Sequence, residues 1–372
     1  MDHLSRFRAL RSRMSEAGIE AMLVTHPPDV RYLCGFTGSN AALAIAGGRA
    51  AFFTDGRYTE QARQQVQGAR VRIAPLSAQT EACAWLAGSG AAQAFFDPVH
   101  TSVADLTRYR KALAGRSGAG RAVSGGRRRI SLQPLHEPLI ATLRMVKDAD
   151  ELKLMGKAAR LGDELFAEIL PKIRAGIRED AIAAELEHRA RDCGAEGMSF
   201  DTILVGGRRS ALPHGRASRR PLPPRGFVTL DFGVILEGYC SDMTRTVFLG
   251  RATRRERYAY DAVRAAELAA IHAVRPGALC GEVDEAARGV LRKAGLAAYF
   301  SHSTGHGVGL EIHEGPRVAA SQSLALAPGM IVTIEPGVYI PGRYGIRLED
   351  MVAVTASGAR LLTTAPAGWT EI

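Results

Sequence analysis

The sequence predicts a chain of two domains, an α/β domain in the N-terminal third and a larger domain built from two similar halves. Three observations carry this prediction. The 372 residues exceed the roughly 100–200 residues of a typical single domain. Short apolar runs alternate with helical patterns in the first third. In the remainder, one strand pattern occurs twice, roughly 100 residues apart.

The N-terminal third has the pattern of an α/β domain. Its opening, MDHLSRFRALRSRMSEAG, is typical of an amphipathic first helix and lacks the apolar core and cleavage site of a secretory signal, so we expect a cytoplasmic protein. Apolar runs that predict strands follow at residues 21–25, 41–46, 50–54 and 94–96. The glycine- and arginine-rich residues 115–129 interrupt every periodicity, and helical spacing returns at residues 149–169. We therefore place the boundary near residue 136, which gives domains 1–136 and 137–372.

Composition and charge restrict the class of protein. Hydrophobic residues make up 46% of the chain and charged residues 23%. No apolar run approaches the ~18 residues that span a bilayer, so we expect a globular, soluble protein with no membrane partner. The net charge is +10, but the arginines are dispersed and form a run only at residues 127–129. That run follows a Ser-Gly-Gly segment, which predicts an exposed loop, and we expect no nucleic-acid partner.

The five cysteines are odd in number, scattered, and without Cys-x-x-Cys spacing. This pattern predicts free thiols rather than a zinc or redox site. Cys240 is close to Asp242 in sequence and is a conceivable nucleophile, but a small side chain that fills apolar space is the simpler interpretation.

The repeated pattern places an acidic residue at the same point of a strand in each half. GFVTLDFGV at residues 226–234 matches MIVTIEPGV at residues 330–338, so that Asp231 corresponds to Glu335. A helix that ends near an Arg-x-Gly tripeptide precedes each copy, at residues 174–176 and 275–277. Two similar halves that face each other would enclose one site.

In the first half, a Glu-Gly pair at residues 237–238 predicts a two-residue hairpin turn. In that register Asp231 lies opposite Thr244, and Asp242 lies opposite Gly233. The two aspartates are then diagonal neighbours on one face, with Cβ atoms within about 7–8 Å. A pair of metal ions roughly 3.5–4 Å apart fits between such carboxylates.

In the second half, Glu335 precedes a glycine-containing loop, and the returning strand carries Glu349. A three-residue loop centred on Gly342 would place Glu335 opposite Glu349, whereas a two-residue loop would send them to opposite faces. A shared site requires the first of these registers, which we adopt as the expectation.

Each of these acids lies in an apolar strand, where an unpaired charge costs several kcal/mol and needs a cationic partner. A metal ion would supply that charge. The alternative is an ordinary ion pair with Arg245 or Arg347. Two hairpins in matching repeats favour the metal.

Histidines add to the candidate site. The segment HSTGHGVGLEIHEGP at residues 302–316 contains His302, His306 and His313, and His214 follows a Leu-Pro pair elsewhere. The glycines beside His306 allow close approach of a bound group. Imidazole is the commonest metal ligand and carries protons near neutral pH. A lone histidine is more often a core or surface residue, but three in one short segment indicate a site.

Together these residues resemble the pita-bread metallopeptidases (family M24), in particular the branch of Xaa-Pro aminopeptidase and Xaa-Pro dipeptidase (prolidase). The segments THPPDVRYL at residues 25–33 and FTDGRY at residues 53–58 resemble the creatinase-type N-terminal domain of that branch. The resemblance covers essentially the whole chain. It implies an α+β pita-bread catalytic domain with an internal two-fold repeat, preceded by a smaller α/β creatinase-like domain.

Carried over by position, the resemblance implies two divalent metal ions per chain, with manganese expected first and cobalt or zinc as alternatives. The implied ligands are Asp231, Asp242, His306, Glu335 and Glu349. Two of them, Asp242 and Glu349, would bridge the ions. Asp231 would bind one ion, and His306 with Glu335 would bind the other.

The same resemblance implies roles in hydrolysis for four side chains. Glu335 would also accept the proton of the attacking water. His214 and His313 would bind the substrate backbone and the oxyanion. His302 would help to orient proline.

The resemblance further implies a proline-containing peptide as substrate and a homodimer. A dipeptidase must pair the free carboxylate that directly follows proline, and arginine is the natural partner. There is no arginine between Val318 and Thr333, and only Arg317, Arg343 and Arg347 are near. We therefore expect an Xaa-Pro aminopeptidase, with an Xaa-Pro dipeptidase as the alternative.

Three other members of the same fold remain as alternatives. Methionine aminopeptidase shares the ligand set, but the N-terminal domain of about 136 residues argues against it. A creatine-cleaving enzyme does not use metal, and the intact ligand set argues against that. A non-catalytic protein-binding module usually loses ligands, and the metal content of the purified protein would distinguish it.

Overall fold

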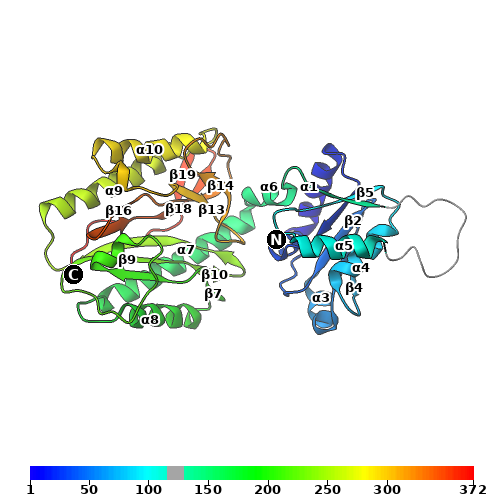
Figure 1. Cartoon of the computed structure of the whole chain (residues 1–372), viewed down its shortest axis with the longest axis horizontal. Coiled ribbons are helices and arrows are strands. Elements are labelled where there is room, and N and C mark those ends of the chain that lie inside the picture. The colour runs from blue at the N-terminus through cyan, green and yellow to red at the C-terminus, as the bar shows by residue number, and fades with distance from the viewer. Residues whose placement is uncertain (115–129) are drawn as a thin grey trace, which may run out of the picture. The chain divides into compact units, whose positions relative to one another are not determined.

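A computed structural model describes residues 1–114 and 130–372 of the chain. The chain divides into two compact units, Met1–Arg144 and Met145–Ile372 (Figure 1). The arginine run at residues 127–129, which we expect to be an exposed loop, lies outside the described residues.

The division between the units falls within helix α6 (Leu139–Met145), later than the boundary predicted near residue 136. Leu139 is buried on the wall of a cavity that it shares with Ile19 and other residues of the first unit. Near the end of the helix, a guanidinium nitrogen of Arg144 donates to Asp29 at 2.8 Å. The contacts of α6 therefore assign most of it to the first unit, and the break in periodicity before it does not mark the boundary.

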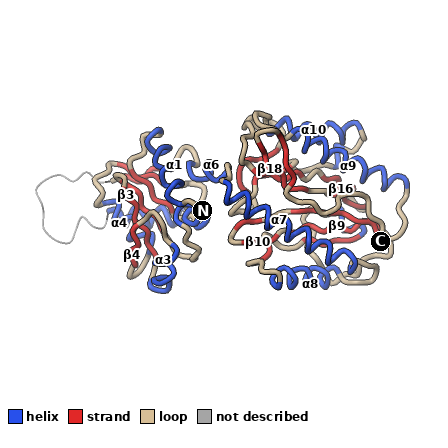
Figure 2. The backbone as a smooth tube through the Cα atoms, turned by 180° about the vertical axis from the view of Figure 1, so that it is seen from behind, coloured by secondary structure: helices blue, strands red, loops and turns tan. Residues whose placement is uncertain are grey.

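The first unit is a mixed sheet with helices packed against it (Figure 2). Its strands lie in the order β4 (Arg70–Ile73), β3 (Arg49–Thr54), β2 (Ala42–Ala46), β1 (Ala21–Val24), β5 (Gln93–Phe96) and β6 (Ser131–Pro134). Its other helices are α1 (His3–Glu16), α2 (Pro27–Cys34), α3 (Thr59–Gln65), α4 (Ala78–Ala87) and α5 (Val103–Ala114). The amphipathic first helix and the strands predicted from apolar runs are confirmed.

Two strands of this sheet, β4 and β6, escape the sequence pattern because both are edge strands. Strand β4 has the sequence Arg-Val-Arg-Ile and is largely exposed, so it has no buried apolar run. Strand β6 ends at Pro134, a residue that edge strands tolerate because one side of their backbone needs no partner. Edge strands that carry charge or proline resist pairing with other chains.

The second unit consists of two halves, each with two helices and a group of antiparallel strands. The first half contains α7 (Ala149–Ile169), α8 (Glu179–Asp192), β7 (Gly197–Met198), β8 (Ile203–Gly206), β9 (Gly226–Phe232), β10 (Val234–Leu236), β11 (Tyr239–Cys240) and β12 (Met243–Leu249). The second contains α9 (Arg254–Ala273), α10 (Cys280–Lys293), β13 (Gly305–Gly307), β14 (Glu314–Val318), β15 (Ile331–Ile334), β16 (Gly337–Ile340), β17 (Tyr344–Arg347), β18 (Asp350–Thr355) and β19 (Gly358–Leu361). The strands lie between the two helix pairs (Figures 1 and 2).

The internal repeat predicted from the sequence is visible in the details of both halves. The glycine of each Arg-x-Gly tripeptide, Gly176 and Gly277, has a φ of +82°. This left-handed conformation favours glycine, which explains the residue at both positions. Strand β9 pairs antiparallel with β8 and β12, and β15 pairs antiparallel with β13 and β18. Each half thus presents a central strand flanked by two antiparallel neighbours.

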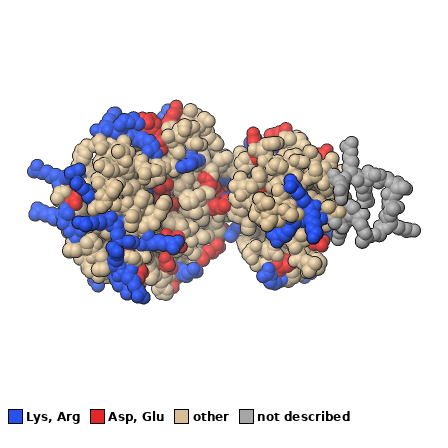
Figure 3. All heavy atoms as spheres, viewed as in Figure 1, with Lys and Arg blue, Asp and Glu red and all other residues tan. Residues whose placement is uncertain are grey.

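None of the helices in the described part of the chain is both long enough and apolar enough to cross a bilayer. Lysine and arginine side chains are found on both units, with a dense group at the end of the second unit that carries the C-terminus (Figure 3). Segments distant in sequence meet in this unit, since Nε of Arg225 donates to the carbonyl oxygen of Arg251 at 2.9 Å. The expectation of no nucleic-acid partner stays a prediction.

Helix α9 buries a carboxyl group, that of Glu267, inside the second half. A guanidinium nitrogen of Arg264 donates to its Oε2 at 2.5 Å, while its buried Oε1 has no hydrogen-bond partner among the described residues. Burial, followed by repulsion from Asp350, raises the pKa of Glu267 to about 8. A carboxyl whose pKa is raised by folding stabilises the fold only while protonated. This stabilisation is therefore lost as the pH rises from the ordinary value of 4.5 through about 8.

Glu267→Gln should therefore change stability in a pH-dependent way. Because the amide cannot ionise, we expect the variant to exceed the wild type in free energy of unfolding at pH 9 by roughly 1–3 kcal/mol, with little difference at pH 5. Urea denaturation at the two pH values measures this. An equal effect at both, or a less stable variant at pH 9, would contradict the assignment of a buried, neutral Glu267.

Candidate metal centre

The hairpin of the first half has the predicted register. Strands β9 and β12 pair so that Asp231 lies opposite Thr244. The turn between β10 and β11 is the two-residue Glu237-Gly238, and both residues have positive φ, 46° and 79°. Such a turn matches the twist of the strands that it joins.

Asp242 lies where regular pairing is interrupted between β11 and β12. Here the backbone of Ser241 approaches Gly233 so closely that a Cβ on Gly233 would lie 1.7 Å from the carbonyl oxygen of Ser241. Only glycine fits at this point. Asp242 is thereby held beside Asp231, whose charge acts on it.

The hairpin of the second half also has the register that a shared site requires. Ile340 pairs with Tyr344, so the loop has three residues and is centred on Gly342, with φ of +71°. Strand pairing is interrupted between β16–β17 and β15–β18, but β15 and β18 continue in the same register. Glu335 and Glu349 therefore lie opposite each other, and the three-residue loop is confirmed.

The two hairpins meet along a seam formed by β12 and the residues around Glu349. The backbone N–H of Glu349 donates to the carbonyl oxygen of Thr244 at 3.1 Å. The hydroxyl of Thr244 donates to Oε2 of Glu349 at 2.6 Å. Two residues further along β12, the hydroxyl of Thr246 donates to the carbonyl oxygen of Arg347 at 2.8 Å. The seam brings the acids of one half against those of the other.

A cavity of about 700 Å³ in the second unit opens onto this seam. It lies within the roughly 300–1,000 Å³ range of small-molecule sites. Every residue predicted for the site lines it: Asp231, Asp242, His306, Glu335, Glu349, His214, His302 and His313. The structure therefore brings all of them together, from both halves.

The carboxylates of the cavity are buried and repel one another. Burial, and then the charge of Glu349, raise the pKa of Asp242 well above its ordinary range. Burial and the charge of Glu335 do the same to the pKa of Glu349. Burial raises the pKa of Glu335 to about 8. Such a cluster is unfavourable unless cations offset it.

His306 presents one ring nitrogen to this cluster. Its Nδ1 lies 3.0 Å from the carbonyl oxygen of Gly307, to which it donates. The lone pair is then on Nε2, which lies 3.6 Å from Oδ2 of Asp242 and 3.4 Å from Oε1 of Glu335. Burial lowers the pKa of His306 to about 4, so the ring is neutral at neutral pH. A backbone acceptor on the opposite ring nitrogen is the usual support of a metal-binding histidine.

The other histidines occupy the wall of the cavity. His302 is engaged at both ring nitrogens, since Nδ1 donates to the carbonyl oxygen of Ser303 at 2.8 Å and Nε2 lies 3.0 Å from the hydroxyl of Tyr339. The ring of His313 packs edge-on against that of His306, with centroids 4.5 Å apart. Burial lowers the pKa of His313 as well.

Arg347 joins several parts of the site. Its guanidinium donates to Oδ2 of Asp231, and Nε donates to the hydroxyl of Thr244 at 3.1 Å. A further nitrogen donates to the hydroxyl of Tyr339 at 2.6 Å and to the carbonyl oxygen of Pro213 at 3.1 Å. The ion pair considered as an alternative to metal therefore exists at Asp231. Arg245, the other candidate, pairs instead with Asp350 at 2.6 Å.

The residues present fit divalent cations. Asp242, Glu349 and His306 each place a ligand atom within 4.8 Å of the other two. Oδ1 of Asp231 is buried without a hydrogen-bond partner among the described residues, although Oδ2 of the same carboxylate is paired. An orphaned oxygen beside three crowded carboxyl groups is what a hard cation would satisfy.

Sequence reasoning missed two of the residues that hold this site, Thr244 and Tyr339. The predicted register places Thr244 opposite Asp231, so its position in the first hairpin could be predicted. Its hydrogen bond to Glu349 could not, because it depends on how the two halves dock. Tyr339 contacts Arg347 and His302 through its hydroxyl, and no sequence spacing indicates that.

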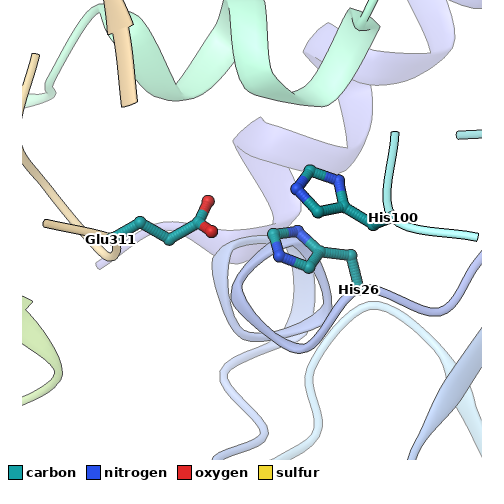
Figure 4. A group of neighbouring side chains, drawn as sticks. All are labelled: His26, His100 and Glu311. Atoms are coloured by element: carbon teal, nitrogen blue, oxygen red, sulfur yellow. The ribbon is translucent and has the colours of Figure 1, made fainter. Parts of the chain in front are cut away.

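Two further histidines, His26 and His100, lie in the first unit (Figure 4). Their rings stack, with centroids 3.6 Å apart and planes inclined by 10°. Nδ1 of His100 lies 2.7 Å from Oδ2 of Asp97, and Nδ1 of His26 lies 3.4 Å from Oδ2 of Asp29. Because parallel stacked rings cannot both direct an in-plane lone pair at one ion, this arrangement does not suit a shared metal.

Family models match both units of the chain. Residues 153–356 match the model of metallopeptidase family M24. Residues 6–146 match that of the creatinase/prolidase N-terminal domain. The second match ends close to the division that the structure shows.

Relatives and solved structures agree with these models. An uncharacterized peptidase of Bacillus subtilis (strain 168) is 37% identical over 96% of this chain and 97% of its own length. The structure of an Xaa-Pro dipeptidase from Bacillus anthracis has a TM-score of 0.92 and 35% identity, covering 100% of both chains. That of an X-Pro aminopeptidase from Thermotoga maritima has a TM-score of 0.86 and 31% identity, covering 99% of both.

The fold prediction is confirmed by these matches, in the creatinase-like first unit and in the two-fold repeat of the second. The ligand roles assigned by position stay predictions, supported by the geometry of the cavity. From its sequence, its architecture and the acids that meet along its seam, the chain belongs to metallopeptidase family M24.

Proposed function

We propose that the protein is an Xaa-Pro aminopeptidase, a metal-dependent hydrolase that cuts the peptide bond before a proline in the second position of a peptide. The observation that carries the proposal is the convergence of five potential ligands from both halves on one cavity. The names of similar solved structures, an Xaa-Pro dipeptidase and an X-Pro aminopeptidase, support proline specificity. A cavity of about 700 Å³ gives room for more than a dipeptide.

Asp231, Asp242, His306, Glu335 and Glu349 would hold two divalent ions, and manganese is the ion that we expect. When bound, these ions supply the Lewis acidity that activates water and polarises the scissile carbonyl. As parts of the same proposal, we expect a cytoplasmic protein and a homodimer.

The side chains of the cavity have separate tasks in this proposal. Glu335 takes up the proton of the attacking water on its carboxylate and returns it to the leaving nitrogen. His214 and His313 donate hydrogen bonds to the substrate carbonyl oxygen as negative charge develops on it. His302, with both ring nitrogens engaged, offers the surface of its ring to proline.

Dipeptide hydrolysis is a second candidate because of Arg317. This side chain is exposed and lines the cavity from β14, where it pairs with His306 across the strands. An arginine in this place could bind the carboxylate of an Xaa-Pro dipeptide through two parallel hydrogen bonds. Arg317 therefore weakens the preference for an aminopeptidase that follows from the absence of arginine between Val318 and Thr333.

Hydrolysis assays after removal and return of metal test the proposal. Protein treated with a chelator should cleave nothing, and added manganese should restore cleavage of Ala-Pro-Ala but not of Ala-Ala-Ala. Comparison with Ala-Pro measures the preference for length. A manganese-loaded protein that leaves both proline substrates intact would refute the proposed function.

Arg317→Ala separates the two candidates. If Arg317 binds the dipeptide carboxylate, kcat/KM for Ala-Pro should fall roughly 10–100-fold, the loss expected for one charge-assisted pair. Cleavage of Ala-Pro-Ala, whose carboxylate lies one residue further away, should change little. Arg343→Ala, an exposed arginine outside the cavity lining, is the matched control. Equal losses on both substrates would show that Arg317 does not read the carboxylate.

A further inference from the structure

Glu179, the first residue of α8, is a buried acid that the proposed chemistry does not use. Its side chain is 2% exposed. Oε1 accepts from the backbone N–H of Gly206 at 3.0 Å and from Nε of Arg209 at 3.1 Å. Oε2 accepts from the same Nε at 3.1 Å, and from the backbone N–H and the hydroxyl of Ser218 at 3.1 and 2.7 Å. All of these donors belong to residues 206–218, so one carboxylate gathers both ends of that segment.

This segment carries His214, which is exposed and lines the cavity. The carbonyl oxygen of the residue before His214 accepts from Arg347 at 3.1 Å. On the other side, the carbonyl oxygen of Arg216 accepts from a guanidinium nitrogen of Arg209 at 2.6 Å. The same guanidinium pairs through Nε with Glu179. The backbone around His214 is therefore held between two arginines, and Glu179 holds the second of them.

The internal repeat shows what this carboxylate adds. Glu179 corresponds to Cys280 of the second half, since each is the third residue after the glycine of its Arg-x-Gly tripeptide. In both halves, the first two backbone N–H groups of the helix that begins there donate to a later loop at 3.0 and 2.9 Å. In the second half, the segment that leads to this loop contains β14, which pairs with β13. In the first half, residues 212–217 belong to no strand, and the carboxylate takes the place of strand pairing.

We propose that Glu179 is a positioning residue for His214, whose segment it holds through Arg209 and Ser218. This inference rests on the proposed function, in which His214 donates a hydrogen bond to the substrate carbonyl oxygen. The carboxylate is the only group that accepts from both ends of the segment at once. The side chain of Glu179 therefore acts on the reaction through the place of His214 and not by contact with substrate.

Glu179→Gln tests this directly, because a carboxylate only accepts hydrogen bonds whereas an amide also donates them. Whichever way the amide turns, its N–H₂ group faces donors, and those donors are left without an acceptor. The substitution also removes the charge that faces Arg209. Arg209→Lys is a second, independent variant. It keeps the charge opposite Glu179, but a single ammonium cannot replace the planar guanidinium that also donates to Arg216.

Asp163→Asn is the matched control. Asp163 lies on α7 and, like Glu179, accepts from two backbone N–H groups and a hydroxyl of a distant segment. Its donors are Thr364 and Ala365, at 2.7–3.0 Å. Neither Asp163 nor these donors line the cavity. The control therefore removes an anchor of the same kind from a segment without a proposed role in catalysis, and it should keep wild-type activity.

In Glu179→Gln, kcat/KM for Ala-Pro-Ala should fall roughly 10–100-fold, as a displacement of about 1 Å can cause. The fall should be in kcat rather than KM, because His214 is proposed to act on charge that develops during the reaction. His214→Ala should lose on the order of 10²-fold, as loss of an oxyanion donor does. Added to His214→Ala, Glu179→Gln should lose no more than about twofold further, because both changes remove one interaction. Arg209→Lys should depend on His214 in the same way.

Hydrogen exchange tests the positioning without any need for activity. In metal-free Glu179→Gln, the backbone amides of residues 207–218 should exchange faster than in the wild type. In metal-free Asp163→Asn they should exchange at the wild-type rate. Manganese content should equal that of the wild type in every variant, since none of the donors to Glu179 is a proposed metal ligand.

An equal loss of kcat from Glu179→Gln in the presence and absence of His214 would overturn the inference, because Glu179 would then act on the fold as a whole. Loss of manganese in proportion to activity, or unchanged exchange of residues 207–218, would overturn it as well. So would wild-type activity of His214→Ala. If Glu179→Gln does not fold, Arg209→Lys decides the question by the same comparison. A wild-type protein inactive on every proline substrate instead refutes the proposed function, and the exchange measurement then judges Glu179.

Discussion

Asp242→Asn should reduce hydrolysis of Xaa-Pro substrates on the order of 10³-fold or more, a larger loss than removal of a single oxyanion donor causes. Asparagine keeps the shape of the side chain but cannot supply the negative charge that Asp242 would contribute as a metal ligand. Asp242 lies 3.6 Å from the ring nitrogen of His306 and belongs to the group of three residues whose ligand atoms are mutually within 4.8 Å. Metal analysis of the purified variant, together with the peptide assay, measures both consequences.

The same substitution should have the opposite effect on the metal-free protein. Burial and the charges of neighbouring acids raise the pKa of Asp242, so its carboxyl group opposes folding when no cation is bound. We expect chelated Asp242→Asn to melt at or above the temperature of the chelated wild type. Added manganese should raise the melting temperature of the wild type by mass action and leave that of the variant unchanged.

Asp261→Asn is the control for these measurements, because Asp261 is an exposed acid on α9 that pairs with Arg257 at 3.0 Å. It should match the wild type in metal content and activity. A chelated Asp242→Asn that melts well below the chelated wild type would mean that Asp242 stabilises the fold by itself. Retained activity would remove Asp242 from the candidate ligands.

Arg347→Met should weaken metal binding or activity by roughly 10–100-fold, the usual cost of losing a residue that orients ligands. Its guanidinium pairs with Asp231 and donates to Thr244, which in turn donates to Glu349. Without it, two proposed ligands from different halves lose a common support. The free energy of unfolding should also fall, by about 3–5 kcal/mol, because Asp231 remains buried without its partner.

Arg347→Lys should rescue little of this loss. A single ammonium cannot replace a planar group that donates in several directions at once. Manganese titration followed by calorimetry, and urea denaturation of the metal-free proteins, separate the effect on binding from that on folding. Arg343→Met, on the same hairpin but exposed, serves as control. If Arg347→Met binds manganese as tightly as the wild type, Arg347 supports the fold rather than the ligands.

Local sequence signals predicted the parts of the fold that depend on local rules. A Glu-Gly pair predicted the two-residue turn of the first hairpin. The loop of the second hairpin left two registers open, and the one that pairs Glu335 with Glu349 was expected only because a shared site requires it. Because side chains alternate along a strand, the correct register also gave the correct face. The repeat then predicted that two such hairpins share one cavity.

Features that depend on long-range contacts could not be predicted in this way. Arg347 could be foreseen only as an alternative cation for the buried acids, since its bond to Asp231 forms after the halves dock. Glu179 finds its donors 27 to 39 positions further along the chain. The edge strands β4 and β6 have no apolar run, and the last residues of α6 join the first unit through one buried ion pair.

The seam between β12 and Glu349 bears on how such a protein would gain and release its ions. Two of the proposed ligands come from the first half of the second unit and three from the second half. A bound cation would therefore cross-link the two halves. Release of the cation would then require the two halves to separate at the seam. The rate at which the metal ion exchanges would measure how often they do so.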